Sequence, residues 1–152
     1  MHGHFFDMVG IRTPDDVIFL ADCISSKNTL EKYQIAFIYD VAEYLNTMDK
    51  IESMEAAMFV PVHSDATSDI TGIAQFNRQK VFDISNNIQS ILKTPMCFET
   101  LLKRFLDEYG LVMNFEQYVL VESTVRSYLV WLKDNDKIRA IFTDNQLMWS
   151  SL

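Results

Sequence analysis

Cysteine, glycine and proline are all scarce in this chain of 152 residues. It contains two cysteines, four glycines and three prolines. Two cysteines are too few for the disulfide framework of a small secreted protein, and four glycines leave little room for a glycine-rich phosphate loop. The two thiols instead favour a reducing compartment, so we expect a cytoplasmic protein.

Long apolar runs and positive charge are also missing. No run approaches the roughly 20 apolar residues that cross a bilayer. Residues 1–4, MHGH, lack the basic and apolar regions of a signal peptide. The 13 basic and 21 acidic residues give a net charge of −8, which disfavours binding to nucleic acid or to an anionic membrane. We therefore expect neither partner.

What the chain does have is enough apolar sequence for a packed core. Hydrophobic residues make up 49% of it and charged residues 22%, which is typical of one globular domain or two small ones. Short apolar segments at residues 5–9 and 17–21 flank a turn sequence at residues 13–16, and predict a β-hairpin. A third apolar run, residues 57–60, ends in polar residues and predicts a buried strand.

Helical periodicity fills much of the remainder. We expect helices over residues 29–33, 40–48 and 69–92, the last beginning at Ser68 or Asp69. A further helix over residues 98–109 should end at Gly110, and Asn114 should begin another that runs to about residue 132. Residues 138–142 and 147–149, on either side of a turn at residues 143–146, predict a second hairpin.

The pattern changes after Pro95, and this predicts the domain organisation. The first part, residues 1–94, alternates short strands with helices and closes on a long helix. The second part, residues 95–152, has two helices followed by a hairpin, which is a winged-helix-like outline. We therefore expect an α/β fold over residues 1–94 and a winged-helix-like α+β tail over residues 95–152.

Three residues are candidate metal ligands: His4 before the first strand, Asp22 at the end of the second, and His63 at the end of the third. Imidazole and carboxylate groups at strand ends suit a zinc or iron site. Their sequence separation matches no local metal-binding motif, however. Spacing alone therefore favours the interpretation that Asp22 and His63 are ordinary loop residues.

The residues that surround these three candidates favour a metal site instead. Residues 3–10, GHFFDMVG, resemble the Gly-His segment of the metallo-β-lactamase fold superfamily. Residues 17–22, VIFLAD, and 59–63, FVPVH, resemble the family's later strands, one ending in Asp and one in His. The resemblance covers about residues 2–68. It implies that His4 ligates one metal ion, Asp22 bridges two, and His63 ligates the second.

One family motif has no counterpart. The principal metal motif, His-X-His-X-Asp-His, is expected upstream of the Gly-His segment, and the chain contains no such sequence. The resemblance therefore implies the C-terminal half of an αββα sandwich, from a longer hydrolase whose two ions are zinc, with iron or manganese as alternatives. This chain alone is expected to be inactive and to hold few or none of these ions. Such a half would leave one sheet face bare, so we also expect a homo-oligomer.

Other polar residues near these segments are weaker candidates. His2 stands where relatives commonly have a small residue or proline. Cys23 should point away from Asp22 as a buried free thiol, because side chains alternate along a strand. Asp7 and Asp65 are better explained as turn residues, with the orientation of a ligand histidine as a lesser alternative.

Three functions remain open. The first is a metal-dependent hydrolase, or part of one, acting on a small-molecule ester, thioester, lactam, lactone or phosphodiester, with a diiron redox protein as a variant. The second is a nucleic-acid-binding module that uses the tail, which six basic and eight acidic residues between Pro95 and Leu152 disfavour. The third is a non-catalytic interaction protein. No residue is assigned a catalytic role.

Overall fold

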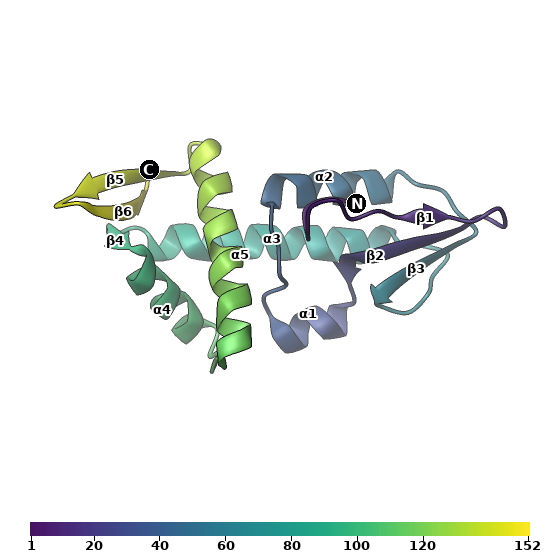
Figure 1. Ribbon diagram of the computed structural model, residues 1–152, viewed down its shortest axis with the longest axis horizontal. Coiled ribbons are helices and arrows are strands. Elements are labelled where there is room, and N and C mark those ends of the chain that lie inside the picture. Colours follow the sequence, from purple (N-terminus) through teal and green to yellow (C-terminus); the bar gives the residue numbers. More distant parts are fainter. The chain divides into compact units, whose positions relative to one another are not determined.

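The computed structural model describes residues 1–152 and contains five helices and six strands. The chain forms two compact units, Met1–Val81 and Phe82–Leu152. Each unit has its own three-stranded sheet, and helix α3 (Thr71–Ile91) contributes residues to both (Figure 1). The boundary between the compact units therefore lies inside α3, whereas the domain boundary predicted after residue 94 lies just beyond its end.

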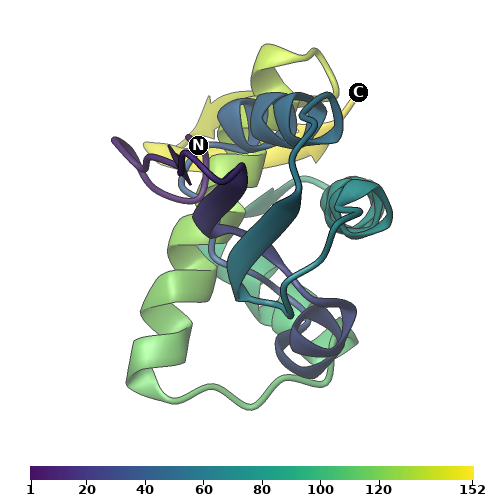
Figure 2. The ribbon, with the colours of Figure 1, turned by 90° about the vertical axis from the view of Figure 1, so that its right-hand side faces the viewer.

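The first unit is built on the sheet β1-β2-β3. Its strands are β1 (Ile11–Arg12), β2 (Val17–Ser25) and β3 (Met58–His63). β1 pairs antiparallel with β2, and β3 pairs parallel with β2. A parallel pair needs a crossover connection, and α1 (Lys27–Tyr33) and α2 (Val41–Glu52) lie in it. The second strand of the predicted hairpin and the third strand are confirmed, and β2 and β3 run side by side in Figure 2.

The prediction of a strand over residues 5–9 is wrong. The hairpin's first strand is only Ile11–Arg12, and residues 5–9 form turns and irregular backbone. Asp7 has a left-handed φ of 57°, which breaks the extended conformation that a strand needs. The apolar run at Phe5 and Phe6 therefore has a different role, because these rings stack on each other at a centroid distance of 4.3 Å.

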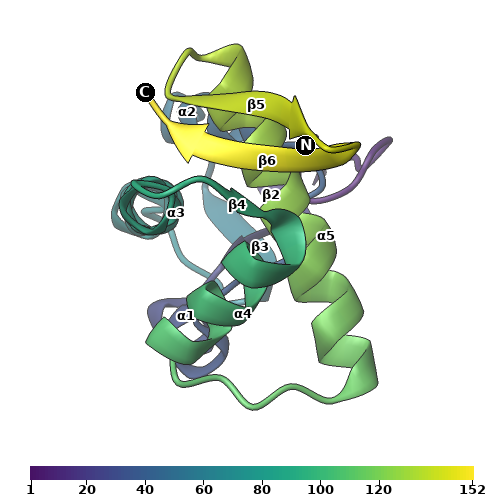
Figure 3. The ribbon, with the colours of Figure 1, turned by 90° about the vertical axis from the view of Figure 1, so that its left-hand side faces the viewer.

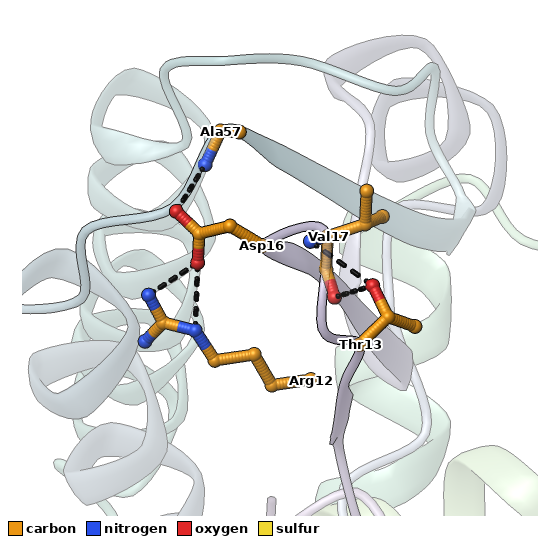
Figure 4. A network of polar contacts seen from close by, with 5 residues as sticks. All are labelled: Arg12, Thr13, Asp16, Val17 and Ala57. Carbon is orange, nitrogen blue, oxygen red and sulfur yellow. Dashed lines mark hydrogen bonds and ion pairs between the residues drawn. The ribbon is translucent and has the colours of Figure 1, made fainter.

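The hairpin turn also fixes the start of β3. The Asp16 carboxylate pairs with the Arg12 guanidinium and accepts a hydrogen bond of 3.0 Å from the backbone N–H of Ala57 (Figure 4). The Thr13 hydroxyl donates to the Val17 carbonyl at 3.2 Å. One turn therefore holds the beginning of both parallel strands. This fixes how β2 and β3 are aligned with each other along the sheet.

The two faces of this sheet differ in burial. Ile18 and Leu20 of β2 and Phe59 of β3 are buried. On the other face Ile11 lies opposite Phe19, and Phe19 lies opposite Val60. Ile11 and Phe19 are 61% and 46% exposed. This sheet therefore has one covered apolar face and one bare apolar face. A parallel pair of strands is normally covered on both faces.

The helices of this unit begin within two residues of the predicted starts, α1 at Lys27, α2 at Val41 and α3 at Thr71. Ser26 and Asp40 accept hydrogen bonds from the backbone N–H groups of Thr29 and Glu43, and so cap α1 and α2. Asp69 accepts from the N–H of Thr71 at 2.9 Å at the start of α3. The three predicted helices are confirmed, with α2 extending four residues beyond residue 48.

The second unit contains the end of α3, two more helices and the sheet β4-β6-β5. The helices are α4 (Phe98–Glu108) and α5 (Phe115–Asp134); the strands are β4 (Met96–Cys97), β5 (Ile138–Thr143) and β6 (Gln146–Ser151) (Figure 3). β5 and β6 form the predicted hairpin, with Asp144 and Asn145 both at positive φ in its turn, as a type I′ turn requires. β4 was not predicted, because two residues carry no periodicity.

Both predicted helix boundaries in this unit are confirmed. Gly110 has a φ of +63°, its N–H bonds to the Asp107 carbonyl, and the N–H of Leu111 bonds to the Leu106 carbonyl. These two bonds are the Schellman arrangement that ends a helix. Asn114 accepts from the N–H of Gln117 at 2.8 Å. The winged-helix likeness of residues 95–152 stays a prediction. No helix is both long and apolar enough to cross a membrane.

Candidate metal centre

Asp22 and His63 lie together because β2 and β3 are parallel neighbours. Asp22 is in the second half of β2, and His63 is the last residue of β3. The His63 Nε2 lies 3.4 Å from the Asp22 Oδ1, and the two side chains are 50% and 40% exposed. Parallel strands commonly place binding groups outside their carboxyl ends. The structure thus brings these two predicted ligands next to each other.

The backbone around His63 is held from α1. Its carbonyl accepts a 2.9 Å hydrogen bond from the backbone N–H of Ser26 and a longer one, 3.4 Å, from the Thr29 hydroxyl. Ser26 is also the cap of α1. The end of β3 is thereby tied to the residue that follows β2, so that both candidate ligands sit on the same local framework.

A bulge in β2 sets the direction of Asp22. The register with β3 shifts on both sides of Ala21, and Ala21 has a φ of 52°. Left-handed backbone at a residue other than glycine is strained. Bulges of this kind turn a side chain away from the direction that simple alternation gives it. Asp22 is consequently half-exposed while Cys23 is fully buried.

His4 is held on a separate segment, residues 3–6, by backbone pairing. The backbone carbonyl of Gly3 accepts hydrogen bonds from the N–H groups of Tyr39 and Asp40 at 2.9 and 3.0 Å. This pairing lays residues 3–6 along residues 37–40. The His4 ring then meets the Phe37 ring edge to face, with centroids 5.4 Å apart.

The electrostatics of His4 link it to the other two candidates. Burial lowers the pKa of His4 below 6.5, and His63 adds to that lowering. The Asp22 carboxylate and a backbone hydrogen bond with Phe37 act in the opposite direction. His4 therefore interacts electrostatically with both Asp22 and His63. A lowered pKa favours the neutral imidazole, which is the form that coordinates a metal.

These donors fit part of a metal site. Two ligands of a tetrahedral zinc ion, each about 2.1 Å from it, lie about 3.4 Å apart, and the Asp22 and His63 atoms have that separation. The hydrogen bond of His4 with the Phe37 backbone is the kind of contact that orients a ligand histidine. No three His, Cys, Asp or Glu side chains converge closely enough to hold one ion between them, however.

The remaining sequence candidates are not brought into this group. His2, Asp7 and Asp65 are exposed, and His2 contributes its backbone carbonyl to the Thr47 hydroxyl instead. Cys23 is a buried free thiol, as predicted. Its Sγ donates to the Leu20 carbonyl at 2.8 Å, and burial raises its pKa to about 12. A thiol in this state is a poor ligand.

Sequence reasoning missed the residues that position the three candidates. Phe37, which contacts His4, is one of many aromatic residues in the sequence, and Ala21 is simply the last residue of the apolar segment 17–21. Gly3 was noted only as part of a motif, but its backbone touches α2 so closely that a Cβ would overlap the Tyr44 backbone. The Gly3 conformation, at a φ of +102°, has a sequence signal in the glycine itself. The other two have none.

Comparisons with solved structures agree with this architecture. A metallo-beta-lactamase family protein from Thermus thermophilus superposes with a TM-score of 0.71 at 12% identity, over 99% of this chain and 47% of that one. A beta-lactamase domain protein from Burkholderia ambifaria gives a TM-score of 0.78 at 11% identity, over 99% and 46%. This chain has part of the metallo-β-lactamase fold. It spans less than half the length of either solved neighbour.

The likeness is one of structure alone. No family model and no curated protein matches the sequence. At 11–12% identity the shared fold is established, whereas chemistry has to be argued from the residues of this chain. The resemblance deduced from the Gly-His segment and the two strand ends therefore identified the fold correctly.

Proposed function

We propose that this metallo-β-lactamase-fold chain provides three ligands of a dinuclear metal-dependent hydrolase: His4, Asp22 and His63. The observation that carries the proposal is the 3.4 Å separation between the Asp22 Oδ1 and the His63 Nε2 at adjacent carboxyl ends of parallel strands. His4, from a third segment, interacts electrostatically with both. The types of donor atom suit zinc, with iron or manganese as alternatives.

Each of the three would have a distinct role. Asp22 has two carboxylate oxygens and is the residue suited to bridge two ions, with His4 serving one and His63 the other. When bound, two such ions lower the pKa of a water molecule and polarise the oxygen of a carbonyl or phosphoryl group. The Asp22 carboxylate is a negatively charged donor, and the lowered pKa of His4 favours the neutral imidazole that binds a metal.

The expected substrate is a small molecule with an ester, thioester, lactam, lactone or phosphodiester bond. The remaining ligands would come from residues outside the 152 described here. Two observations support this: three donors do not converge on one ion, and the solved neighbours are about twice as long. We expect this chain alone to bind zinc weakly and to lack hydrolytic activity, since a catalytic zinc needs three protein ligands.

The test has two steps. The genomic DNA upstream of the Met1 codon is read for an in-frame His-X-His-X-Asp-His sequence. The longer protein is then analysed for metal after dialysis and screened against ester, thioester and lactam substrates. We expect two metal ions in the longer protein and turnover that is lost in His63→Ala. No upstream motif, or two tightly held ions in the 152-residue chain, would contradict the proposal.

A non-catalytic role is the alternative, either in protein interaction or in nucleic-acid binding through the tail. The charges of α5 disfavour nucleic acid, because Arg126 is engaged with Glu122 at 2.6 Å and with the ring of Phe98. A nucleic-acid module needs a free basic stripe. A genuine translation start at Met1 would favour protein interaction instead.

A further inference from the structure

Three aromatic rings stand exposed immediately beside His4. Phe5 and Phe6 stack with centroids 4.3 Å apart at an interplanar angle of 27°. Tyr39 contacts both edge to face, at 6.0 and 5.7 Å. The three side chains remain 44%, 56% and 51% exposed, and contiguous exposed apolar surface marks an interaction site, a ligand site or an aggregation hazard. We call Phe5, Phe6 and Tyr39 the aromatic cluster.

The cluster is tied to the segment that carries His4 through the backbone. Phe5 is its neighbour in the chain, and consecutive Cα atoms are about 3.8 Å apart. The backbone N–H of Tyr39 bonds to the carbonyls of Gly3 and His4, at 2.9 and 3.3 Å. The same two segments bring the Phe37 ring against His4. A molecule held by the rings would therefore lie beside the segment that carries His4.

From this arrangement we propose that the aromatic cluster is a binding site for an uncharged aromatic group, carried by the substrate of the candidate metal centre. Ring stacking is the contact that these side chains offer, and it suits a planar partner more than an aliphatic one. The identification of the bound molecule as the substrate rests on the proposed function. The aromatic preference itself does not.

The charges beside the cluster determine which aromatic groups fit. Asp7 follows Phe6, and Asp40 follows Tyr39; both are exposed. Neither has a basic partner among the ion pairs of the chain, since Asp40 accepts from the backbone N–H of Glu43 instead. A carboxylate on the aromatic group would face these two acids. The site therefore favours neutral rings over anionic ones.

The experiment measures binding of benzamide to the full 152-residue chain by saturation-transfer NMR, with acetamide and benzoate as comparison probes. We expect benzamide to bind more tightly than either. Because each ring contact contributes modestly, Phe6→Ala should weaken benzamide binding about two- to twelvefold. The matched control is Phe115→Ala, another exposed phenylalanine, at the start of α5, which should leave binding unchanged.

Each outcome separates this inference from the proposed function. Equal binding of benzamide and acetamide, or benzamide binding unchanged in Phe5→Ala/Phe6→Ala, would overturn the aromatic site even if the longer protein held its metals. In a second outcome, the double variant loses benzamide binding while the longer protein holds no metal. That result would support the aromatic site and contradict the proposed hydrolase. A change in oligomeric state of the double variant, without loss of benzamide binding, would reassign the cluster to a protein interface. Circular dichroism checks that each variant is folded.

Discussion

Two left-handed residues determine where the candidate ligands lie. Gly3, at a φ of +102°, lets the segment carrying His4 touch α2, and Ala21, at 52°, turns β2 just before Asp22. At the first position glycine is required because of both backbone conformation and space. At the second an alanine tolerates the strain. Strained backbone beside a polar cluster is common at functional sites.

Replacing Gly3 is therefore expected to damage both fold and site. In Gly3→Ala the new Cβ would overlap backbone atoms of Tyr44, and the left-handed φ would be strained as well. We expect a loss of about 2–4 kcal/mol in the free energy of unfolding, measured by denaturant titration.

Gly72→Ala is the matched control for that substitution. A Cβ at Gly72 meets nothing within 4 Å, and the residue lies in the first turn of α3. Its stability should be unchanged or raised by up to about 1 kcal/mol. Equal effects of the two substitutions would show that the contact between Gly3 and α2 does not exist in solution.

The two cysteines should differ in reactivity. Cys23 is fully buried with its pKa raised to about 12, whereas Cys97 is partly exposed beside the Thr100 hydroxyl. Only the thiolate reacts with iodoacetamide. At pH 8 we expect one carbamidomethyl group per native chain, located at Cys97 by peptide mass spectrometry, and two after denaturation. Modification of Cys23 in the native protein would contradict its burial.

Among the secondary-structure elements, one side chain joins three. The Asn77 amide of α3 is buried; its Oδ1 accepts from the Ser25 N–H and the Tyr44 hydroxyl, and its Nδ2 donates to the carbonyls of Ser25 and Ile73. All four bonding positions of the amide are used. The end of β2, which carries Asp22, is thereby tied to α3 and α2.

Asn77→Asp tests this junction. The substitution replaces the Nδ2 donor with an oxygen that faces two carbonyls in a buried place. We expect a loss of about 2–4 kcal/mol in unfolding free energy, since each broken buried hydrogen bond costs about 1–3 kcal/mol. Asn86→Asp, an exposed residue of the same helix, should cost less than about 0.5 kcal/mol. A similarly small loss of stability at both positions would show that the hydrogen bonds of Asn77 do not stabilise the junction of β2, α2 and α3.

The elements that sequence could predict are those with local signals. Periodicity and capping residues predicted the helices around Asp40, Asp69 and Asn114, and Gly110 predicted the end of α4. The strand at residues 5–9 was predicted wrongly, because apolar residues in a row do not reveal that Asp7 adopts a left-handed turn. Stacking of Phe5 and Phe6 replaced strand pairing there.

The candidate site was predictable only where a resemblance supplied long-range information. Spacing alone favoured Asp22 and His63 as ordinary loop residues, since the contact between them joins residues far apart in the chain. Parallel pairing of β2 with β3 brings them together. The contact of His4 with Phe37, and the bulge at Ala21, depend on tertiary packing that no local pattern encodes.

For the molecule as a whole, the bare sheet face is the feature with the largest consequence. Its outward residues are apolar on all three strands. Ile11, Phe19 and Val62 are among the exposed large hydrophobic residues. Val60 pairs with Phe19 across the sheet and precedes Val62 by two residues on β3. A contiguous apolar patch of this kind marks an interface or an aggregation hazard. Two copies packed sheet to sheet would cover it with a contact that closes on itself.

We therefore expect the 152-residue chain to self-associate at micromolar concentration, and Phe19→Lys to shift it toward monomer. Phe19 lies on the central strand, between Ile11 and Val60, so a lysine there would be buried without a partner in the associated form, at a cost of several kcal/mol. Light scattering gives the mass of each form. Phe142→Lys, on the exposed strand β5 of the other unit, should leave the mass unchanged. A monodisperse wild-type monomer would rule out this interface, because the face would then be tolerated bare.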